Sequence, residues 1–307
     1  MDRVRFGIIG SGFMGRTQAE ALTKYVDRGE LVAIAGGSRA PALASEYQVE
    51  HLDSVEALVA RADIDAVVIA TPHALHAEQT ILAAQQGKHV LVDKPLATTL
   101  EDCDAMIEAC RAAGVNLMVQ QTQRFRLVNM EAKRVIDEGL IGRVRMIRET
   151  QMATGGLSAL PAWQARPENV GLLLGHGVHN LDRMRWLAGD EPAQICAHSG
   201  AFAGDSPVEL SSMSLVRFRG GAVGSFWCVW ECPPPAFPAS SSSAWIVGEK
   251  GLLDLDAYGQ LRLGMGDAWG VVCEQAPIDW RGKGMLDPAR MEAYRLQDQE
   301  FIDSILE

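Results

Sequence analysis

The sequence predicts an α/β domain with a doubly wound parallel sheet, followed by an α+β domain with a large, open and mostly antiparallel sheet. Two observations predict this order. Up to residue 122, short and almost wholly apolar segments alternate with segments of helical pattern, as expected for parallel strands buried on both faces. From residue 123 on, longer segments of strand character follow one another across tight turns, which favours antiparallel pairing. We therefore expect two domains, residues 1–122 and residues 123–307.

The elements of the first domain follow from apolar runs and from signals at helix ends. Pro41 stands at a first helical position, and Ser54 and Thr99 are typical N-cap residues. Gly87 and Gly114 follow helical patterns, as C-terminal glycines commonly do. The predicted elements are strands 4–9, 31–35, 66–70, 89–92 and 115–119, and helices 16–25, 41–47, 55–61, 74–86 and 101–113.

The second domain begins with a helix and continues mainly with strands. Glycine-containing turns at residues 219–221 and 248–251 join neighbouring strand segments. The predicted elements are helices 129–138 and 177–187, and strands 144–151, 193–198, 208–218, 222–230, 244–247, 252–255 and 271–273.

Charge and composition exclude several classes of protein. Lysine and arginine number 28 against 39 acidic residues, and the resulting charge of −11 repels phosphate backbones and anionic lipids. We therefore expect no nucleic acid and no membrane as a partner. The sequence has no apolar run of membrane-spanning length and begins directly with a strand pattern, which favours a cytoplasmic protein. The six cysteines include no C-x-x-C pair, so we expect no disulfide and no metal site.

A glycine motif joins the first strand to the first helix. Gly10, Gly12 and Gly15 form G-x-G-x-x-G, with Phe13 and Met14 inside it. The first glycine permits a tight turn, the second lets the backbone approach a pyrophosphate, and the third allows close packing of helix and strand. The diphosphate then lies at the positive end of the helix. This position in a βα unit predicts a dinucleotide site that includes all five residues.

The end of the second strand bears on the choice between NAD and NADP. An acidic residue there would bind the ribose 2′-hydroxyl of NAD, but the sequence has Ser38 and Arg39, and no carboxylate precedes Glu46. Arg39 can pair with a 2′-phosphate and Ser38 can donate a hydrogen bond to it. The alternative is that Arg39 is a solvated surface residue. We expect NADP to be preferred and NAD to be possible.

Two further segments follow predicted strands at the edge where doubly wound folds bind ligands. Residues 71–76 read T-P-H-A-L-H, and residues 93–95 read D-K-P. Lys94 is well placed over a nicotinamide, although a lone lysine in a loop is more often a surface residue. These motifs, together with G-x-H-x-x-D at residues 177–182 and W-L-x-G at residues 186–189, resemble those of the Gfo/Idh/MocA oxidoreductases, the family of glucose–fructose oxidoreductase, inositol dehydrogenase and rhizopine-catabolism proteins.

The resemblance implies a Rossmann domain and a second domain whose open sheet forms a homodimer or homotetramer. It also implies hydride transfer between NAD(P) and an alcohol carbon of a sugar, cyclitol or related polyol. In the matching motifs, Lys94 contacts the nicotinamide ribose and the substrate hydroxyl, and His179 is the general acid/base. Asp93 replaces the usual glutamate. The cofactor side includes Thr71, Pro72, His76 and Asp93, and the candidate substrate residues are His73, Gln121, Arg124, Trp163, Gln164, His176, Asn180 and Asp182.

One departure from the family pattern concerns the surroundings of His179. Sugar-oxidising members often have an aspartate four residues before the histidine, where this sequence has Gly175. His176 can take over part of that role, and the pair His176/His179 could also be read as two metal ligands, although no carboxylate or cysteine stands nearby at ligand spacing. Two other functions stay open: an NAD-dependent glycosidase of the same family, and a cofactor-binding sensor without catalysis, against which the presence of Lys94 and His179 argues.

Overall fold

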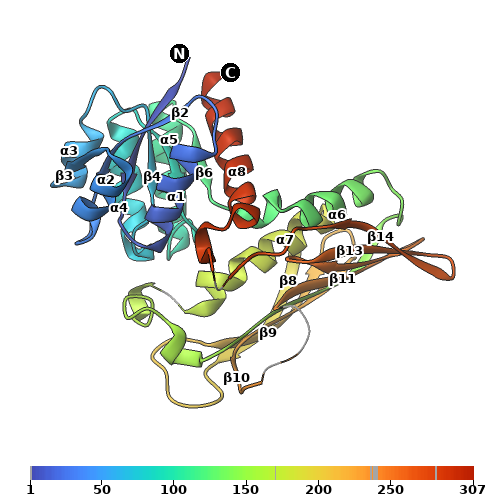
Figure 1. The fold of residues 1–307 in the computed structure, drawn as a ribbon. Coiled ribbons are helices and arrows are strands. Elements are labelled where there is room, and N and C mark those ends of the chain that lie inside the picture. Colours follow the sequence, from blue (N-terminus) through green and yellow to red (C-terminus); the bar gives the residue numbers. More distant parts are fainter. Residues whose placement is uncertain (1, 170, 236, 238–240, 281) are drawn as a thin grey trace. The chain divides into compact units, whose positions relative to one another are not determined.

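The computed structural model describes residues 2–169, 171–235, 237, 241–280 and 282–307, and it divides the chain into two units (Figure 1). Unit 1 comprises Met1–Thr122 and Asp279–Glu307, and unit 2 comprises Gln123–Ile278. The sequence placed residues 123–307 together, whereas the last segment belongs to unit 1. Its helix α8 (Pro288–Leu306) buries Phe301 and Ile302 in the core around β1 (Val4–Ile9). These apolar contacts between opposite ends of the chain explain the difference.

The sheet of unit 1 is parallel throughout and has the strand order β3-β2-β1-β4-β5-β6. This order confirms the predicted doubly wound sheet, and it places a topological switch point between β1 and β4. The strand β3 was not predicted, because it is a short edge strand of only three residues. The strands after β1 are β2 (Gly29–Ala35), β3 (Glu50–Leu52), β4 (Ala66–Ile69), β5 (His89–Val92) and β6 (Leu117–Val119).

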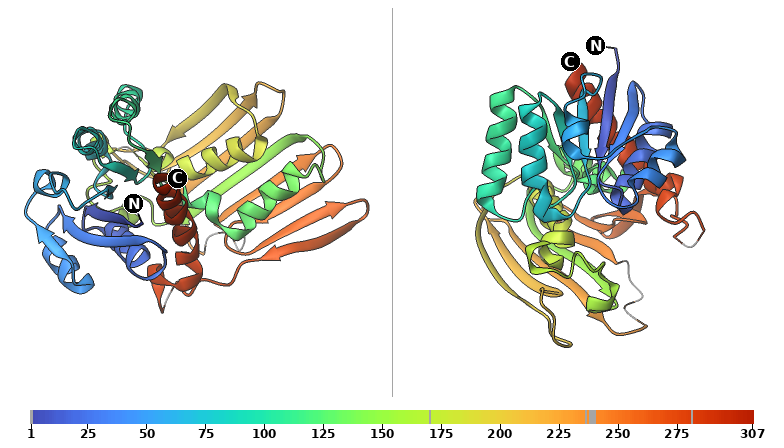
Figure 2. Two further views of the ribbon diagram at one scale, coloured as in Figure 1. Left: turned by 90° about the horizontal axis from the view of Figure 1, so that it is seen from above. Right: turned by 90° about the vertical axis from the view of Figure 1, so that its left-hand side faces the viewer.

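Helices cover both faces of this sheet (Figure 2). On one face lie α1 (Phe13–Lys24), α2 (Ala40–Tyr47) and α8, and on the other lie α3 (Val55–Val59), α4 (His76–Gln85) and α5 (Leu100–Ala113). The predicted N-caps are confirmed. Ser54 accepts a hydrogen bond from the Ala57 amide at 3.0 Å, and Thr99 accepts one from the Asp102 amide at 3.1 Å. Among the described residues, no helix is both long and apolar enough to cross a bilayer.

Unit 2 is built on an eight-stranded sheet with the order β14-β13-β12-β11-β7-β10-β9-β8. Neighbouring strands are antiparallel except β7 and β10, which are parallel, so the predicted, mostly antiparallel sheet is confirmed. The strands are β7 (Val144–Thr154), β8 (Pro192–Gly200), β9 (Ser211–Phe218), β10 (Val223–Cys232), β11 (Ser242–Gly248), β12 (Leu252–Asp256), β13 (Gln260–Met265) and β14 (Ala268–Glu274).

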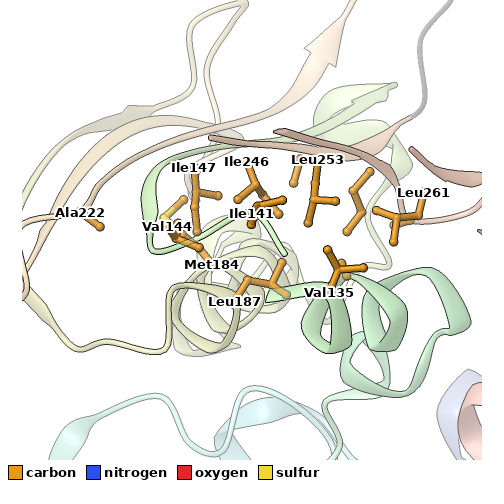
Figure 3. Close-up of a cluster of buried hydrophobic side chains, with 14 of the residues drawn as sticks. Val135, Ile141, Val144, Ile147, Met184, Leu187, Ala222, Ile246, Leu253 and Leu261 are labelled. Atoms are coloured by element: carbon orange, nitrogen blue, oxygen red, sulfur yellow. The ribbon is translucent and has the colours of Figure 1, made fainter. Parts of the chain in front are cut away.

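Two helices, α6 (Leu127–Asp137) and α7 (Val178–Ala188), pack on one face of this sheet. Figure 3 shows the apolar side chains between the layers: Ile147 and Ile246 extend from the strands, and Val135 and Leu187 extend from the helices. A π-helical turn, Leu173–Gly177, leads directly into α7. The sheet therefore holds the first turn of α7, which carries His179, on a rigid base.

Candidate active site

The three glycines of the motif have different tasks in the structure. Gly10 has a φ of +114°, and a Cβ built there would lie 2.5 Å from the Ala70 carbonyl oxygen. A Cβ at Gly15 would lie 2.0 Å from the Gly10 carbonyl oxygen. The fold itself therefore requires glycine at both positions, since a side chain would collide with backbone atoms.

Gly12 is different, because the protein leaves space above it. Among the described residues, a Cβ at Gly12 would meet within 4 Å only the Arg39 Nη2 atom, at 3.7 Å. Gly12 is the N-cap of α1, and its position at the helix start directs backbone N–H groups toward the open space. An open position above a helix N-terminus fits the pyrophosphate of a dinucleotide. The residues present therefore fit the cofactor predicted from the motif.

The turn after β2 presents a positive charge beside this space. Gly36 and Gly37 have φ values of +82° and +80°, and the Ser11 hydroxyl donates to the Gly36 carbonyl at 2.9 Å. Ser38 and Arg39 follow and are exposed. Arg39 forms no ion pair with a described residue. Glu46, the first acidic residue after Arg39 in the sequence, is instead paired with Arg16 at 2.7 Å.

The C-terminal helix α8 supports the glycine turn through contacts that no local sequence pattern indicates. The Arg290 guanidinium lies over the Phe13 ring at 5.2 Å from its centroid. The Tyr294 hydroxyl lies 4.0 Å from the Met14 sulfur. Both motif residues predicted as cofactor contacts therefore have side-chain contacts with α8, and α8 fixes the backbone from which α1 begins.

His76 links the loops that follow β4 and β5. Its Nε2 lies 3.0 Å from the Thr71 carbonyl oxygen and its Nδ1 lies 2.9 Å from the Pro95 carbonyl oxygen, and the ring is fully buried. Thr71 donates from its hydroxyl to Gln79 at 2.6 Å. The predicted cofactor residue His76 thus holds the backbone on either side of a candidate site. Pro72 caps the short 3-10 helix His73–Leu75, whose His73 is buried.

Asp93 and Lys94 lie at the carboxyl end of β5. The Lys94 amide donates to the Asp93 carboxylate at 2.9 Å. Burial raises the pKa of Asp93 and lowers the pKa of the Lys94 ammonium, because desolvation disfavours the charged form of each. A lysine whose pKa is lowered can exchange a proton nearer to neutral pH than an ordinary lysine. Gln121 follows the end of β6, the next strand of the sheet.

In unit 2 the predicted residues gather around the first turns of α7. His179 is the second residue of α7, and Gly175 and His176 lie in the π-helical turn before it. The His176 ring packs on Trp230 of β10 with centroids 4.5 Å apart. The position where sugar-oxidising relatives often have an aspartate is thus a buried helical glycine one turn before His179.

Two of the predicted substrate residues are paired with each other. The Arg124 guanidinium donates to both carboxylate oxygens of Asp182, at 2.8 and 2.7 Å. In this bidentate ion pair, each group neutralises the charge of the other. Of two further candidates, Gln164 is buried, and the Trp163 carbonyl accepts a hydrogen bond from Asn169 at 3.1 Å.

A buried ion pair that the sequence did not indicate anchors α7. Glu149 of β7 accepts from Arg183, with Nε at 2.9 Å, and from the Asn180 amide at 3.0 Å. All three side chains are buried. Asn180, predicted to contact substrate, therefore points to Glu149. The available signal was that Glu149 lies two residues after the buried Ile147, on the same face of its strand.

The six cysteines carry free thiols. Within the described ranges, no group of three His, Cys, Asp or Glu side chains could hold a metal ion.

Known families match both units. A family model described as "Oxidoreductase family, NAD-binding Rossmann fold" matches residues 4–121, and one described as "GFO/IDH/MocA C-terminal domain" matches residues 129–254. The 1,5-anhydro-D-fructose reductase of Ensifer adhaerens is 36% identical over 231 residues, which cover 72% of this chain and 68% of that protein. The 2,7-anhydro-N-acetylneuraminate hydratase of Escherichia coli (strain K12) is 29% identical over 270 residues, which cover 85% and 70%.

A solved structure shares the fold of nearly the whole chain. Levoglucosan dehydrogenase in complex with NADH and levoglucosan matches with a TM-score of 0.84 at 25% identity, covering 99% of this chain and 90% of that one. The doubly wound sheet, the open glycine turn and these matches define an NAD(P)-dependent oxidoreductase. The chain belongs to the Gfo/Idh/MocA oxidoreductase family.

Proposed function

We propose that the protein transfers a hydride between a nicotinamide cofactor and a secondary alcohol or ketone of a sugar, cyclitol or related polyol. The observation that carries the proposal is Lys94, whose pKa burial lowers, at the carboxyl end of β5 in a dinucleotide-binding sheet. The similar proteins named as an anhydrofructose reductase and a levoglucosan dehydrogenase support this substrate class.

In the proposed mechanism, Lys94 and His179 act on the substrate hydroxyl. When bound, the nicotinamide ring supplies the hydride acceptor or donor. His179 takes the hydroxyl proton as general base, and returns it when a ketone is reduced. Lys94 stabilises the developing alkoxide by its positive charge. The Glu149–Arg183 pair holds α7 and with it the backbone of His179.

A substrate screen tests the proposal. Sugars, cyclitols and dihydrodiols are offered with NADP⁺ and with NAD⁺, and formation of reduced nicotinamide is followed by absorbance. The proposal expects net reduction with at least one polyol. Product formation without any net change in reduced cofactor would favour the glycosidase alternative, and tight cofactor binding without turnover of any compound would favour the sensor.

We further propose that NADP(H) binds more tightly than NAD(H), with Arg39 reading the 2′-phosphate. Arg39→Ala is expected to narrow the difference between the two cofactors by about 1–3 kcal/mol, because a charge-assisted hydrogen bond is lost. Titration of each cofactor by fluorescence measures both dissociation constants. Equal affinity of the unmodified protein for the two cofactors would contradict this preference.

Gly12→Val is the control for the site itself. Its side chain has room in the protein beside Arg39, but it occupies the space in which the pyrophosphate would lie. Binding of both cofactors should therefore be lost while the melting temperature changes little. Gly15→Val should instead lower the melting temperature, since its Cβ would overlap the Gly10 carbonyl.

We also propose that the open sheet face of unit 2 joins copies of the chain into a homodimer or homotetramer. Large apolar side chains such as Met146, Ile195, Leu215 and Trp245 are exposed on it, around a groove of about 790 Å³. Apolar patches of this kind commonly mark interfaces. Leu215→Glu is expected to shift the sedimentation coefficient toward the monomer. Sedimentation of the unmodified protein as a monomer at micromolar concentration would refute the proposal.

A further inference from the structure

Arg126 is a buried cation in unit 2. It is the N-cap residue of α6, and 4% of its surface is exposed. Its guanidinium lies over the Tyr258 ring, 4.4 Å from the centroid. Its Nε and Nη1 atoms are buried and have no hydrogen-bond partner in the described part of the chain. The aromatic ring makes a cation–π contact with one face of the guanidinium. The N–H donors lie in the plane of the guanidinium, so they still need hydrogen-bond acceptors.

A second buried donor lies on the segment next to Tyr258. The backbone N–H of Gln275 donates to the Gly259 carbonyl at 2.8 Å, which places Gln275 beside the turn between β12 and β13. Its side chain is buried, and its Nε2 also lacks a partner among the described residues. Two side chains from separate segments therefore bring donors without acceptors to one turn.

The same end of the unit 2 sheet carries the candidate residues of α7. The Tyr258 hydroxyl accepts from Gln123 at 3.3 Å, and Asn129 donates to the Gln123 carbonyl at 2.6 Å. Asn129 in turn lies next to Arg183 on α7, with Oδ1 3.5 Å from Nη1. A continuous polar network thus connects the Arg126 turn with the helix of His179.

Arg126 also differs from its neighbour Arg124, the arginine that the sequence singled out. Arg124 is neutralised by Asp182. Arg126 has no ion pair with a described residue, although a buried charge is normally paired. Structural arginines are usually paired with a carboxylate or a carbonyl, and an oxyanion from outside the chain would supply the acceptors that these N–H groups lack.

We propose that Arg126 binds an oxyanion carried by the substrate, so that the substrate is a polyhydroxylated acid. This inference rests on the proposed function for the alcohol that is oxidised, and adds a carboxylate as the second recognition group. The carboxylate accepts from the in-plane N–H groups of Arg126 and the Nε2 of Gln275. The same chemistry would fit inorganic phosphate or a phosphate of the cofactor, and the experiment separates these sources.

The test compares D-glucuronate with D-glucuronamide, which differ in the charge of one group. Binding of each to the protein with NADP⁺ is measured by calorimetry. The unmodified protein should bind glucuronate about ten- to a hundred-fold more tightly, as a charge-assisted hydrogen bond implies. Arg126→Gln should abolish this preference and Arg126→Lys should retain part of it. Arg134→Gln removes the same charge from the exposed face of α6 and should leave the preference unchanged.

Thermal unfolding separates ligand binding from a structural role. Without ligand, Arg126→Gln should melt at the same temperature as the unmodified protein or higher, because it removes an uncompensated buried charge. A lower melting temperature together with an unchanged preference for glucuronate would show that Arg126 is structural and would overturn the proposal. If Arg126→Gln does not fold, equal binding of glucuronate and glucuronamide by the unmodified protein overturns it equally.

The remaining arms identify the source of the anion. Arg126→Gln should leave the dissociation constant of NADP⁺ unchanged. Weaker binding of NADP⁺ by this variant would assign the anion to the cofactor and overturn the proposal. Inorganic phosphate binding as tightly as glucuronate would overturn it as well. Oxidation of neutral polyols with no dependence on Arg126 would refute this inference and leave the proposed function intact. Arg126-dependent binding of glucuronate without oxidation of any alcohol would refute only the proposed function.

Discussion

Replacing Lys94 or His179 by alanine is expected to lower kcat by about 10²–10⁴-fold and to leave cofactor affinity within a few-fold. The two groups are proposed to serve one proton transfer, so the loss of either already removes most of their joint effect. The double variant should therefore be far less impaired than the product of the two single effects. Steady-state kinetics on the substrate found in the screen, with cofactor titrations, measures all three variants.

Lys24→Ala is the matched control for the lysine, since Lys24 is exposed at the end of α1 opposite to the glycine turn and should keep full activity. Nearly full kcat in His179→Ala would show that this residue is not the acid/base, and His176 would be tested next. Strictly multiplicative effects of the two variants would show that Lys94 and His179 act in separate steps.

The pH dependence gives Lys94 a separate signature. Burial lowers the pKa of its ammonium, so the charged form is lost at a lower pH than the value of about 10.4 of an exposed lysine. If the ammonium stabilises the alkoxide, kcat should fall on the alkaline side at a pH below that value. Arg at this position stays charged, so Lys94→Arg should retain some activity and lose the alkaline fall. An unchanged alkaline limb in Lys94→Arg would assign the fall to another group.

The sheet of unit 1 could be predicted because each of its longer strands is marked by a continuous apolar run in the local sequence. Residues 4–9 and 89–92 are strands at the predicted bounds, since an apolar run flanked by turn residues has few other places in a fold. Gly10, Gly12 and Gly15 were predictable for the same reason, because their tasks lie within one βα turn. The short edge strand β3 and strand β13, in which apolar and other residues alternate, lack such a continuous run, and their pairing depends on neighbours that the local sequence does not show.

The candidate site was predictable as a set of residues but not as a set of contacts. The motifs indicated Arg124, Asn180 and Asp182, yet the structure pairs Arg124 with Asp182 and turns Asn180 toward Glu149. Such pairings join segments that are 31 and 58 residues apart in the chain, and no local pattern specifies them. The same holds for Arg126, because no local pattern indicates that its Nε and Nη1 atoms are buried without a partner in the described part of the chain.

A buried acid in unit 1, Asp298, is expected to make the stability of the protein depend on pH. Asp298 of α8 is fully buried among three glutamines, Gln18 of α1, Gln297 of α8 and Gln120, which follows β6. Gln297 donates to its Oδ1 at 3.2 Å, and Gln18 donates to Gln120 at 3.0 Å. Burial raises the pKa of Asp298 to about 7, against the smaller lowering effect of the hydrogen bonds from Gln297 and Gln18.

The protonated form also suits the hydrogen bonding of this cluster. The Oε1 atoms of Gln18 and Gln297 are buried acceptors without a donor in the described part of the chain. A carboxyl O–H can supply a donor to one of these two oxygens, whereas a carboxylate adds one more acceptor. Burial therefore favours the neutral acid in the folded protein, and it outweighs the hydrogen bonds from Gln297 and Gln18, which favour the carboxylate.

The consequence is a stability that falls as the pH rises. In the unfolded chain Asp298 releases its proton near pH 4, and in the folded protein near pH 7. Between these values the folded state holds the additional proton, so the free energy of unfolding contributed by this group is greatest below pH 4 and is lost as the pH rises to about 7. A difference of about three pKa units corresponds to roughly 4 kcal/mol.

Asp298→Asn is neutral at every pH and can donate to the orphan oxygens, so it should remove this dependence and stabilise the protein at pH 8. Asp303→Asn, an exposed change on the same helix, is the matched control and should leave the dependence in place. Urea unfolding at pH 5 and pH 8 measures all three proteins. Equal loss of stability between these pH values in Asp298→Asn and in the unmodified protein would show that Asp298 is ionised in the fold.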